Sequence, residues 1–130
     1  MKVLQGVLRS SHFLVFSKII LTFMFWFSGL MKFLDFQGTL QEMHYFGLTP
    51  VWFFAPAVIA IQLGGSLCVI RGGRFLLPGA GALALFTLLT IPIAHDFWNM
   101  SGADAFQEKL VVMEHLTVVG ALMLVTAVGR

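Results

Sequence analysis

The fold is decided by the stretch Phe13 to Leu34, FLVFSKIILTFMFWFSGLMKFL, whose only charged residues are Lys18 and Lys32. A helix needs about 20 consecutive apolar residues to cross the hydrocarbon core of a bilayer. This stretch meets that length, so we predict that it forms a transmembrane helix. Three further apolar runs of similar length follow along the chain: Val51 to Ile70, Phe75 to Ala94, and Leu110 to Val128. The sequence therefore predicts four spans.

The composition indicates an integral membrane protein and excludes an ordinary soluble domain. Hydrophobic residues make up 58% of the 130 residues and charged residues only 11%, whereas about 25% charged residues are usual in soluble domains. The connections between the runs are short, so we expect one all-α, four-helix membrane domain over residues 1–130, with the lipid bilayer as its surroundings. The basic residues are dispersed rather than clustered, which argues against nucleic-acid binding.

Basic residues are distributed unequally between the two sets of helix ends. One set carries Lys2, Arg9, Lys18, Arg71, Arg74 and Arg130, whereas the other carries only Lys32 and Lys109. Because basic residues favour the cytoplasmic side of a membrane, we predict that both termini are cytoplasmic. Lys18 lies inside the first span, and we expect its ammonium to reach the cytoplasmic interface along apolar surface.

The segment between the first two runs, Asp35 to Gly47, is too polar to cross a membrane. Thr39 and Glu42 have the spacing of a capping box, and Pro50 prevents a helix from continuing. One face of such a helix would carry the apolar side chains of Leu40, Met43 and Phe46. We therefore predict a short amphipathic helix that lies on the outer membrane surface.

Small and polar residues mark the helix faces that we expect to meet other helices. Ala60 and Gly64 have the spacing that lets a neighbouring backbone approach closely. At about 100° per residue, two further stripes are polar or small: Phe25, Ser28, Gly29 and Lys32 in the first run, and Gln62, Gly65 and Ser66 in the second.

Six polar residues in the outer halves of the spans form the candidate site: Lys32, Gln62, His95, Asp96, Glu114 and His115. Ionisable groups inside a span are costly and are functional candidates by default. Antiparallel spans bring the outer helix ends together, so we expect these residues to converge on one outward-opening pocket. Glu114 shares a helical face with Thr117 and Ala121, and we expect it to point inward.

The same residues also allow a purely structural interpretation. Lys32 could neutralise Glu114, and His95 could pair with Asp96, which would lower the cost of burying these groups. The sequence has no regular His spacing that would predict a metal site, and no haem or nucleotide motif. Cys68 is the only cysteine, which excludes a dithiol within one chain.

Several short segments occur in a characteristic order: Ser28-Gly29-Leu30-Met31-Lys32, Phe36-x-Gly38-Thr39, the Gly64-Gly65 span, the Arg71 to Arg74 hairpin, His95-x-Phe97-Trp98-x-Met100, and Thr117-x-x-Gly120. Together they resemble the DoxX family of small bacterial inner-membrane proteins, and in particular its YphA-like branch. The resemblance implies a multi-pass inner-membrane protein related to subunits of quinol-linked oxidoreductases. The family tends to carry a glutamate at the position of Gln62 and a Lys-Asn pair at Glu114-His115, so the site differs in detail.

Two functional hypotheses follow. In the first, the chain is a membrane subunit or partner of a redox system, and its pocket binds a small molecule such as a quinone headgroup or serves a soluble or membrane-bound redox partner. In the second, it is a non-catalytic membrane scaffold whose buried polar residues only fix helix packing. The sequence contains no self-sufficient catalytic motif, and it leaves open whether the chain forms homo-oligomers.

Overall fold

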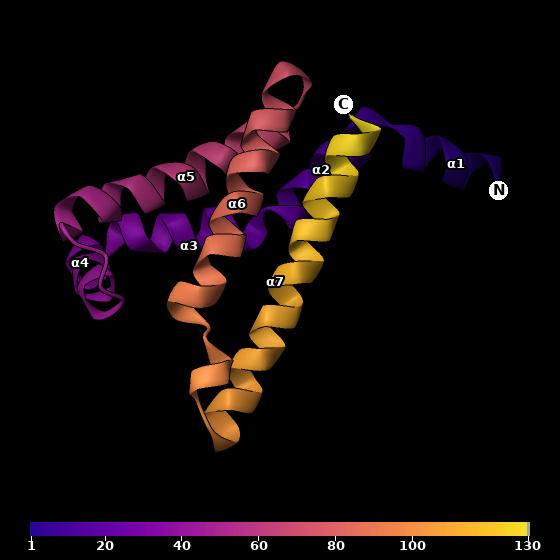
Figure 1. Ribbon diagram of the computed structural model, residues 1–130. Helices are drawn as coiled ribbons and strands as arrows, with labels where there is room; N and C mark the ends of the chain where they lie inside the picture. The colour runs from indigo at the N-terminus through magenta and orange to yellow at the C-terminus, as the bar shows by residue number, and fades with distance from the viewer. Residues whose placement is uncertain (130) are drawn as a thin grey trace.

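The computed structural model describes residues 1–129, and within them every regular element is a helix. The helices are α1 (Lys2–Arg9), α2 (Ser11–Leu21), α3 (Phe23–Leu34), α4 (Phe36–Tyr45), α5 (Val51–Arg71), α6 (Leu76–Ala94) and α7 (Gly102–Val128), with short 3-10 helices at Gly73–Phe75 and Phe97–Asn99 (Figure 1). Three segments are long and apolar enough to cross a membrane: Val51–Arg71, Gly73–Asn99 and Gly102–Val128. The pair α2 and α3 adds a fourth crossing if it counts as one span.

The first apolar run is a bent pair of helices rather than the single helix that we predicted. α2 and α3 meet at Thr22 with a bend of 56°. The buried Thr22 hydroxyl donates to the Lys18 carbonyl at 2.7 Å, and such bonds to the preceding turn bend helices. The indole nitrogen of Trp26 donates to the Ile19 carbonyl at 3.0 Å, so that carbonyl has a partner at the break.

Helix α5 lies at the centre of the fold and packs against α3, α4 and α6, while α7 packs on α6. Glycines set the closest approaches. A Cβ on Gly29 of α3 would lie 3.0 Å from the Gln62 Cβ, and one on Gly79 of α6 would lie 3.0 Å from the Gly65 carbonyl oxygen. The stripe through Phe25 and Gly29 is buried, as predicted.

The predicted close contact through Ala60 and Gly64 is wrong, because both residues are exposed. Gly65 makes the close contact with α6 instead. The stripe of Gln62, Gly65 and Ser66 is buried, which confirms the second part of the prediction.

The main apolar core joins the helices near their basic ends and consists of Phe25, Val69, Leu76, Ala80, Leu83 and Leu122. Away from this core, α3 and α5 run together in one direction and α6 and α7 in another (Figure 1). Within the first run, α2 makes the contact with α7. The outer helix ends therefore do not all converge, in contrast to our expectation.

Helix α4 follows α3 directly and packs against α5. The cap is Asp35, whose side chain accepts a hydrogen bond from the Gly38 amide at 3.1 Å. The predicted cap at Thr39 is therefore wrong. Thr39 is buried and its hydroxyl bonds to the Lys32 carbonyl at 2.9 Å. Met43 packs with Ala55 and Val58 of α5 in a second small core.

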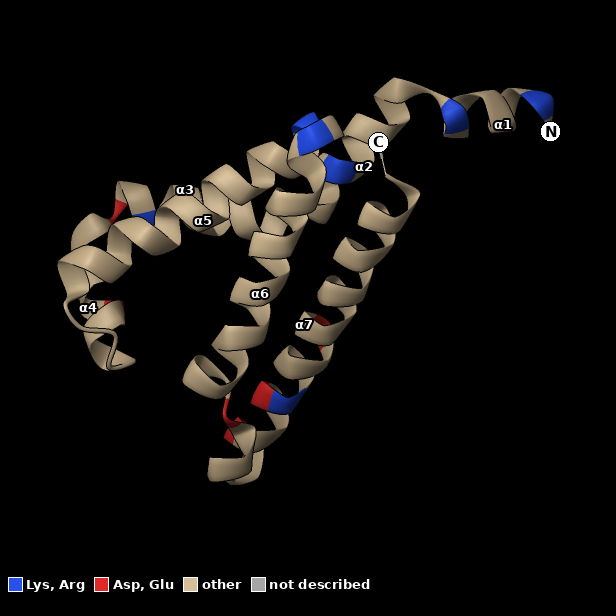
Figure 2. Ribbon diagram, turned by 45° about the horizontal axis from the view of Figure 1, so that its top comes forward, with Lys and Arg blue, Asp and Glu red and all other residues tan. Residues whose placement is uncertain are grey.

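Charges are segregated along the molecule (Figure 2). Most lysines and arginines lie on α1, on α2 and around the start of α6, whereas Lys32 of α3 and Lys109 of α7 lie near the acidic residues toward the opposite ends of the helices. Lys18 is only 3% exposed, so protein covers its side chain, whereas we expected its ammonium to reach the cytoplasmic interface. Helix α1, which we did not predict, extends away from the other helices with none of its residues buried.

The charge segregation predicts the orientation in the membrane. A reporter enzyme that is active only outside the cytoplasm should be inactive when fused after Arg130 and active when fused after Gly102, because basic ends stay in the cytoplasm. A cytoplasmic fluorescent reporter at the same two positions is the control and should give the reverse pattern. Activity of the outside reporter after Arg130 would contradict the orientation.

The glycine contact between α5 and α6 predicts a specific packing defect. A Cβ on Gly79 would lie 2.5 Å from the Cys68 Cβ and 3.1 Å from the Val69 nitrogen. Gly79→Ala should therefore lower the free energy of unfolding in detergent by about 1–3 kcal/mol, as overpacking does. Gly81→Ala is the matched control, because a Cβ on Gly81 meets no atom within 4 Å. Equal stability of the two variants would refute the contact.

Candidate functional site

A cavity of about 460 Å³ lies among α3, α4, α5 and α6 and reaches His95 and His115. Most of its wall is apolar and includes five phenylalanines, Phe25, Phe46, Phe53, Phe54 and Phe86. Of the six residues that the sequence singled out, four line this cavity: Lys32, Gln62, His95 and His115. Asp96 and Glu114 are not part of its wall.

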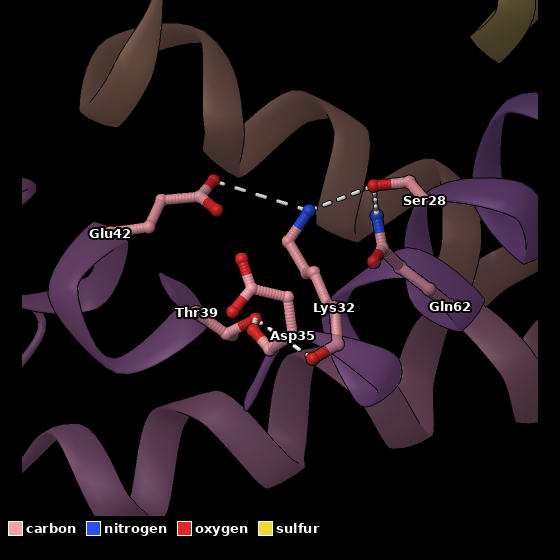
Figure 3. Close-up of polar contacts among 6 residues, drawn as sticks. All are labelled: Ser28, Lys32, Asp35, Thr39, Glu42 and Gln62. Carbon is pink, nitrogen blue, oxygen red and sulfur yellow. Dashed lines mark hydrogen bonds and ion pairs between the residues drawn. The ribbon is translucent and has the colours of Figure 1, made fainter. Parts of the chain in front are cut away.

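On the α3 and α5 side of the cavity, Ser28 is the centre of a polar cluster (Figure 3). Its Oγ accepts a hydrogen bond from Lys32 Nζ at 2.7 Å and another from Gln62 Nε2 at 3.3 Å. Lys32 Nζ also lies 4.0 Å from Glu42 Oε1 of α4. The Glu42 side chain is 44% exposed, so this ion pair is at a solvated edge and contributes little to stability.

The backbone positions this cluster through local features of α3 and α4. Ser28 and Lys32 are one helical turn apart, so their side chains lie on the same face. Gly29 lets that face approach α5 closely enough for Ser28 to reach Gln62. The Thr39 hydroxyl bonds to the Lys32 carbonyl, and this contact holds α4 where Glu42 can face Lys32.

On the α6 and α7 side, two histidines face each other. His95 follows the last residue of α6, and its Nδ1 lies 2.6 Å from Glu108 Oε2 of α7. Its ring contacts the ring of His115 edge-on, with centroids 4.8 Å apart. The carboxylate of Glu108 accepts the Nδ1 hydrogen and thereby fixes the orientation of the imidazole.

The expected charge pairs are replaced by others. Lys32 is paired with Glu42 and not with Glu114, whose side chain is exposed. Our expectation that Glu114 points inward is therefore wrong. His95 bonds to Glu108, whereas Asp96 accepts a hydrogen bond from Asn99 at 3.2 Å. The actual partners, Glu42 of Lys32 and Glu108 of His95, lie on helices whose position relative to these residues cannot be read from the sequence pattern.

One buried polar atom of the cavity wall, Gln62 Oε1, has no hydrogen-bond partner among residues 1–129. Gln62 is only 6% exposed. Leaving a buried acceptor unsatisfied costs about 1–3 kcal/mol, so this oxygen is suited to bind a polar group of a ligand. Within the same residues, no three His, Cys, Asp or Glu side chains are grouped as they would be to hold a metal ion.

Sequence reasoning missed Ser28, Glu42 and Glu108 as members of the site. Ser28 is the easiest to find in retrospect, because it shares the buried stripe with Gly29 and lies one turn before Lys32. Glu42 and Glu108 belong to polar segments next to the spans, and only the three-dimensional arrangement shows which cation or imidazole each one faces.

The role of Ser28 as a shared acceptor gives a stability prediction. Ser28→Ala removes the partner of both Lys32 and Gln62, so it should lower the free energy of unfolding by about 1–3 kcal/mol. Ser17→Ala is the matched control, because the Ser17 hydroxyl donates to the Phe13 carbonyl of its own helix at 2.8 Å. Unfolding in detergent measures both. A Ser28 effect no larger than the Ser17 effect would contradict the cluster.

Comparison with known proteins agrees with this architecture. The DoxX family model matches residues 13–96, which is more than half of the chain. The chain is 24% identical over 116 residues to the inner membrane protein YphA of Escherichia coli K12, and the alignment covers 89% of this chain and 82% of YphA. No solved structure matches significantly. A chain with several membrane-spanning helices, a matching family model and a relative of this kind belongs to the DoxX family.

Proposed function

We propose that the protein is a DoxX-type subunit of a quinone-linked redox system, and that its cavity binds the headgroup of a lipid-soluble quinone. The observation that carries the proposal is the combination of apolar, phenylalanine-rich walls with polar groups from two separate helix pairs. The cavity volume of about 460 Å³ falls in the range of about 300–1,000 Å³ that is typical of small-molecule sites.

A quinone headgroup matches the chemistry of this cavity. It is a flat ring whose two oxygens lie on opposite sides, so phenylalanine side chains can pack on its faces while polar groups bind its edges. Lys32 has an ammonium hydrogen available for a ligand oxygen, because an ammonium has three donors and its contacts among the described residues are with Ser28 and Glu42. Gln62 and the histidines supply the remaining polar groups.

A redox partner has to supply or remove electrons in this proposal. Cys68 is the only cysteine of the chain, so the chain has no dithiol couple of its own. The membrane protein would then hold the quinone headgroup near the outer surface, and a soluble or membrane-bound partner would exchange electrons with it there. The bacterial inner membrane is the expected location, with both termini in the cytoplasm.

The alternative function is that of a membrane scaffold. The bond from Gln62 Nε2 to Ser28 Oγ joins α5 to α3, and hydrogen bonds of this kind hold helices together in membranes. In that case the polar groups would act in packing alone, and the cavity would bind no ligand specifically.

A thermal-shift measurement distinguishes the two functions. Purified protein should melt at a higher temperature with a short-chain ubiquinone or menaquinone analogue, because a ligand at 100 times its dissociation constant stabilises the folded state by about 2.7 kcal/mol. The control ligand is an alkylbenzene of the same chain length, which lacks the two oxygens. A quinone effect that only equals the alkylbenzene effect would favour the scaffold.

A further inference from the structure

The unpartnered polar atom of the cavity, Gln62 Oε1, is not a donor of the kind that a quinone carbonyl needs. Gln62 Oε1 is a carbonyl oxygen, so it can only accept a hydrogen bond. It is buried, lines the cavity and has no partner among the described residues, while Gln62 Nε2 donates one hydrogen bond to Ser28 Oγ (Figure 3). A ligand that satisfies this atom must bring a hydrogen of its own.

The histidine side of the cavity adds a second acceptor when the His95 imidazole is neutral. The Nδ1 of His95 carries its hydrogen toward the Glu108 carboxylate at 2.6 Å, because a carboxylate only accepts. In a neutral imidazole the other nitrogen, Nε2, is then a bare acceptor. The hydroxyls of Thr87 and Thr90, which also line the cavity, already donate to the Leu83 and Thr87 carbonyls at 2.7 Å each.

We infer that the cavity selects the reduced, dihydroxy form of its aromatic ligand, a quinol, over the oxidised quinone. This inference rests on the proposed function, since it concerns the redox form of the same ligand. A quinol hydroxyl both donates and accepts, so it keeps any hydrogen bond that Lys32 offers and adds one to Gln62 Oε1. A quinone oxygen only accepts, so in that form the buried Gln62 oxygen stays unsatisfied.

Selection of this form places the protein in a reaction sequence. A subunit that holds quinol more tightly than quinone stabilises the reduced form at its site and raises the reduction potential of the bound couple. The reaction class that must supply the ligand is therefore a quinone-reducing one elsewhere in the same membrane. Binding itself transfers no electron and needs no co-reactant.

The test is a comparison of affinities under anaerobic conditions, with the full chain in detergent or nanodiscs. Decylubiquinol should bind at least about tenfold more tightly than decylubiquinone, which corresponds to about 1.4 kcal/mol. The dimethyl ether of the quinol, which has no donor hydrogen, should bind no better than the quinone. This ligand series needs no mutation, so it remains informative even where a variant fails to fold.

Variants then assign the preference to one atom. Gln62→Leu should reduce the quinol preference to less than about threefold, because it removes the acceptor at similar volume. Gln62→Glu should retain the preference, because its carboxylate oxygen also accepts. Thr126→Val is the control, since the Thr126 hydroxyl bonds to the Leu122 carbonyl at 2.8 Å and Thr126 is outside the cavity wall.

The outcomes separate the two proposals. Tight binding of quinol with weaker binding of quinone and of the ether supports the inference. Binding of both redox forms with equal affinity, or tighter binding of the quinone, overturns the inference and leaves the proposed quinone site standing. Binding of neither form above the alkylbenzene control overturns both.

Discussion

The structure depends on the close packing of α5 between α3 and α6. Between membrane helices the hydrophobic effect supplies little attraction, so they associate through close packing and hydrogen bonds. Gly29 and Gly79 let the two neighbouring backbones approach α5 from different directions. Because Ser28 is adjacent to Gly29, the same approach brings the Ser28 hydroxyl within 3.3 Å of Gln62. Packing and the polar cluster therefore have one common cause.

The break at Thr22 determines where the cavity lies. A straight first helix would have to pack along the same neighbours over its whole length. The bend of 56° lets α2 contact α7 while α3 continues alongside α5. Beyond the bend, α3 and α5 separate from α6 and α7 (Figure 1), and the cavity forms where these two helix pairs diverge and α4 packs against α5. The position of the cavity therefore follows from the path of the backbone.

The sequence predicts the elements of this fold better than their contacts. Hydrophobic length identifies the spans, and the stripe with Phe25 and Gly29 predicts the buried face of α3, because both depend on local periodicity. The Thr22 break is invisible to hydropathy, since the residues on both sides are apolar. A side-chain hydrogen bond within the helix accompanies the break, and apolar periodicity carries no signal for such a bond.

The candidate site was predictable in part for the same reason. On α7 the buried and half-buried residues include His115, Val118 and Leu122, spaced at 3 and 4 residues. The face that we expected to be buried, which begins at Glu114, is offset from this stripe by one position. A helix with apolar residues all around gives little information about its rotation, so the error was one of rotation and not of depth.

In the cavity, the carboxylate that faces Lys32 lies at an exposed edge, whereas the buried polar position is neutral. The family pattern leads us to expect a glutamate in the second span near Lys32. That position holds the neutral Gln62 instead. The carboxylate that faces Lys32 belongs to Glu42, which lies at an exposed edge. A charge costs less where water can reach it. The buried position can then hold a neutral carbonyl oxygen, which needs a hydrogen-bond donor and not a counter-ion. An uncharged hydroxyl is the group that satisfies such an oxygen inside a membrane, whereas a second ammonium would add an uncompensated charge.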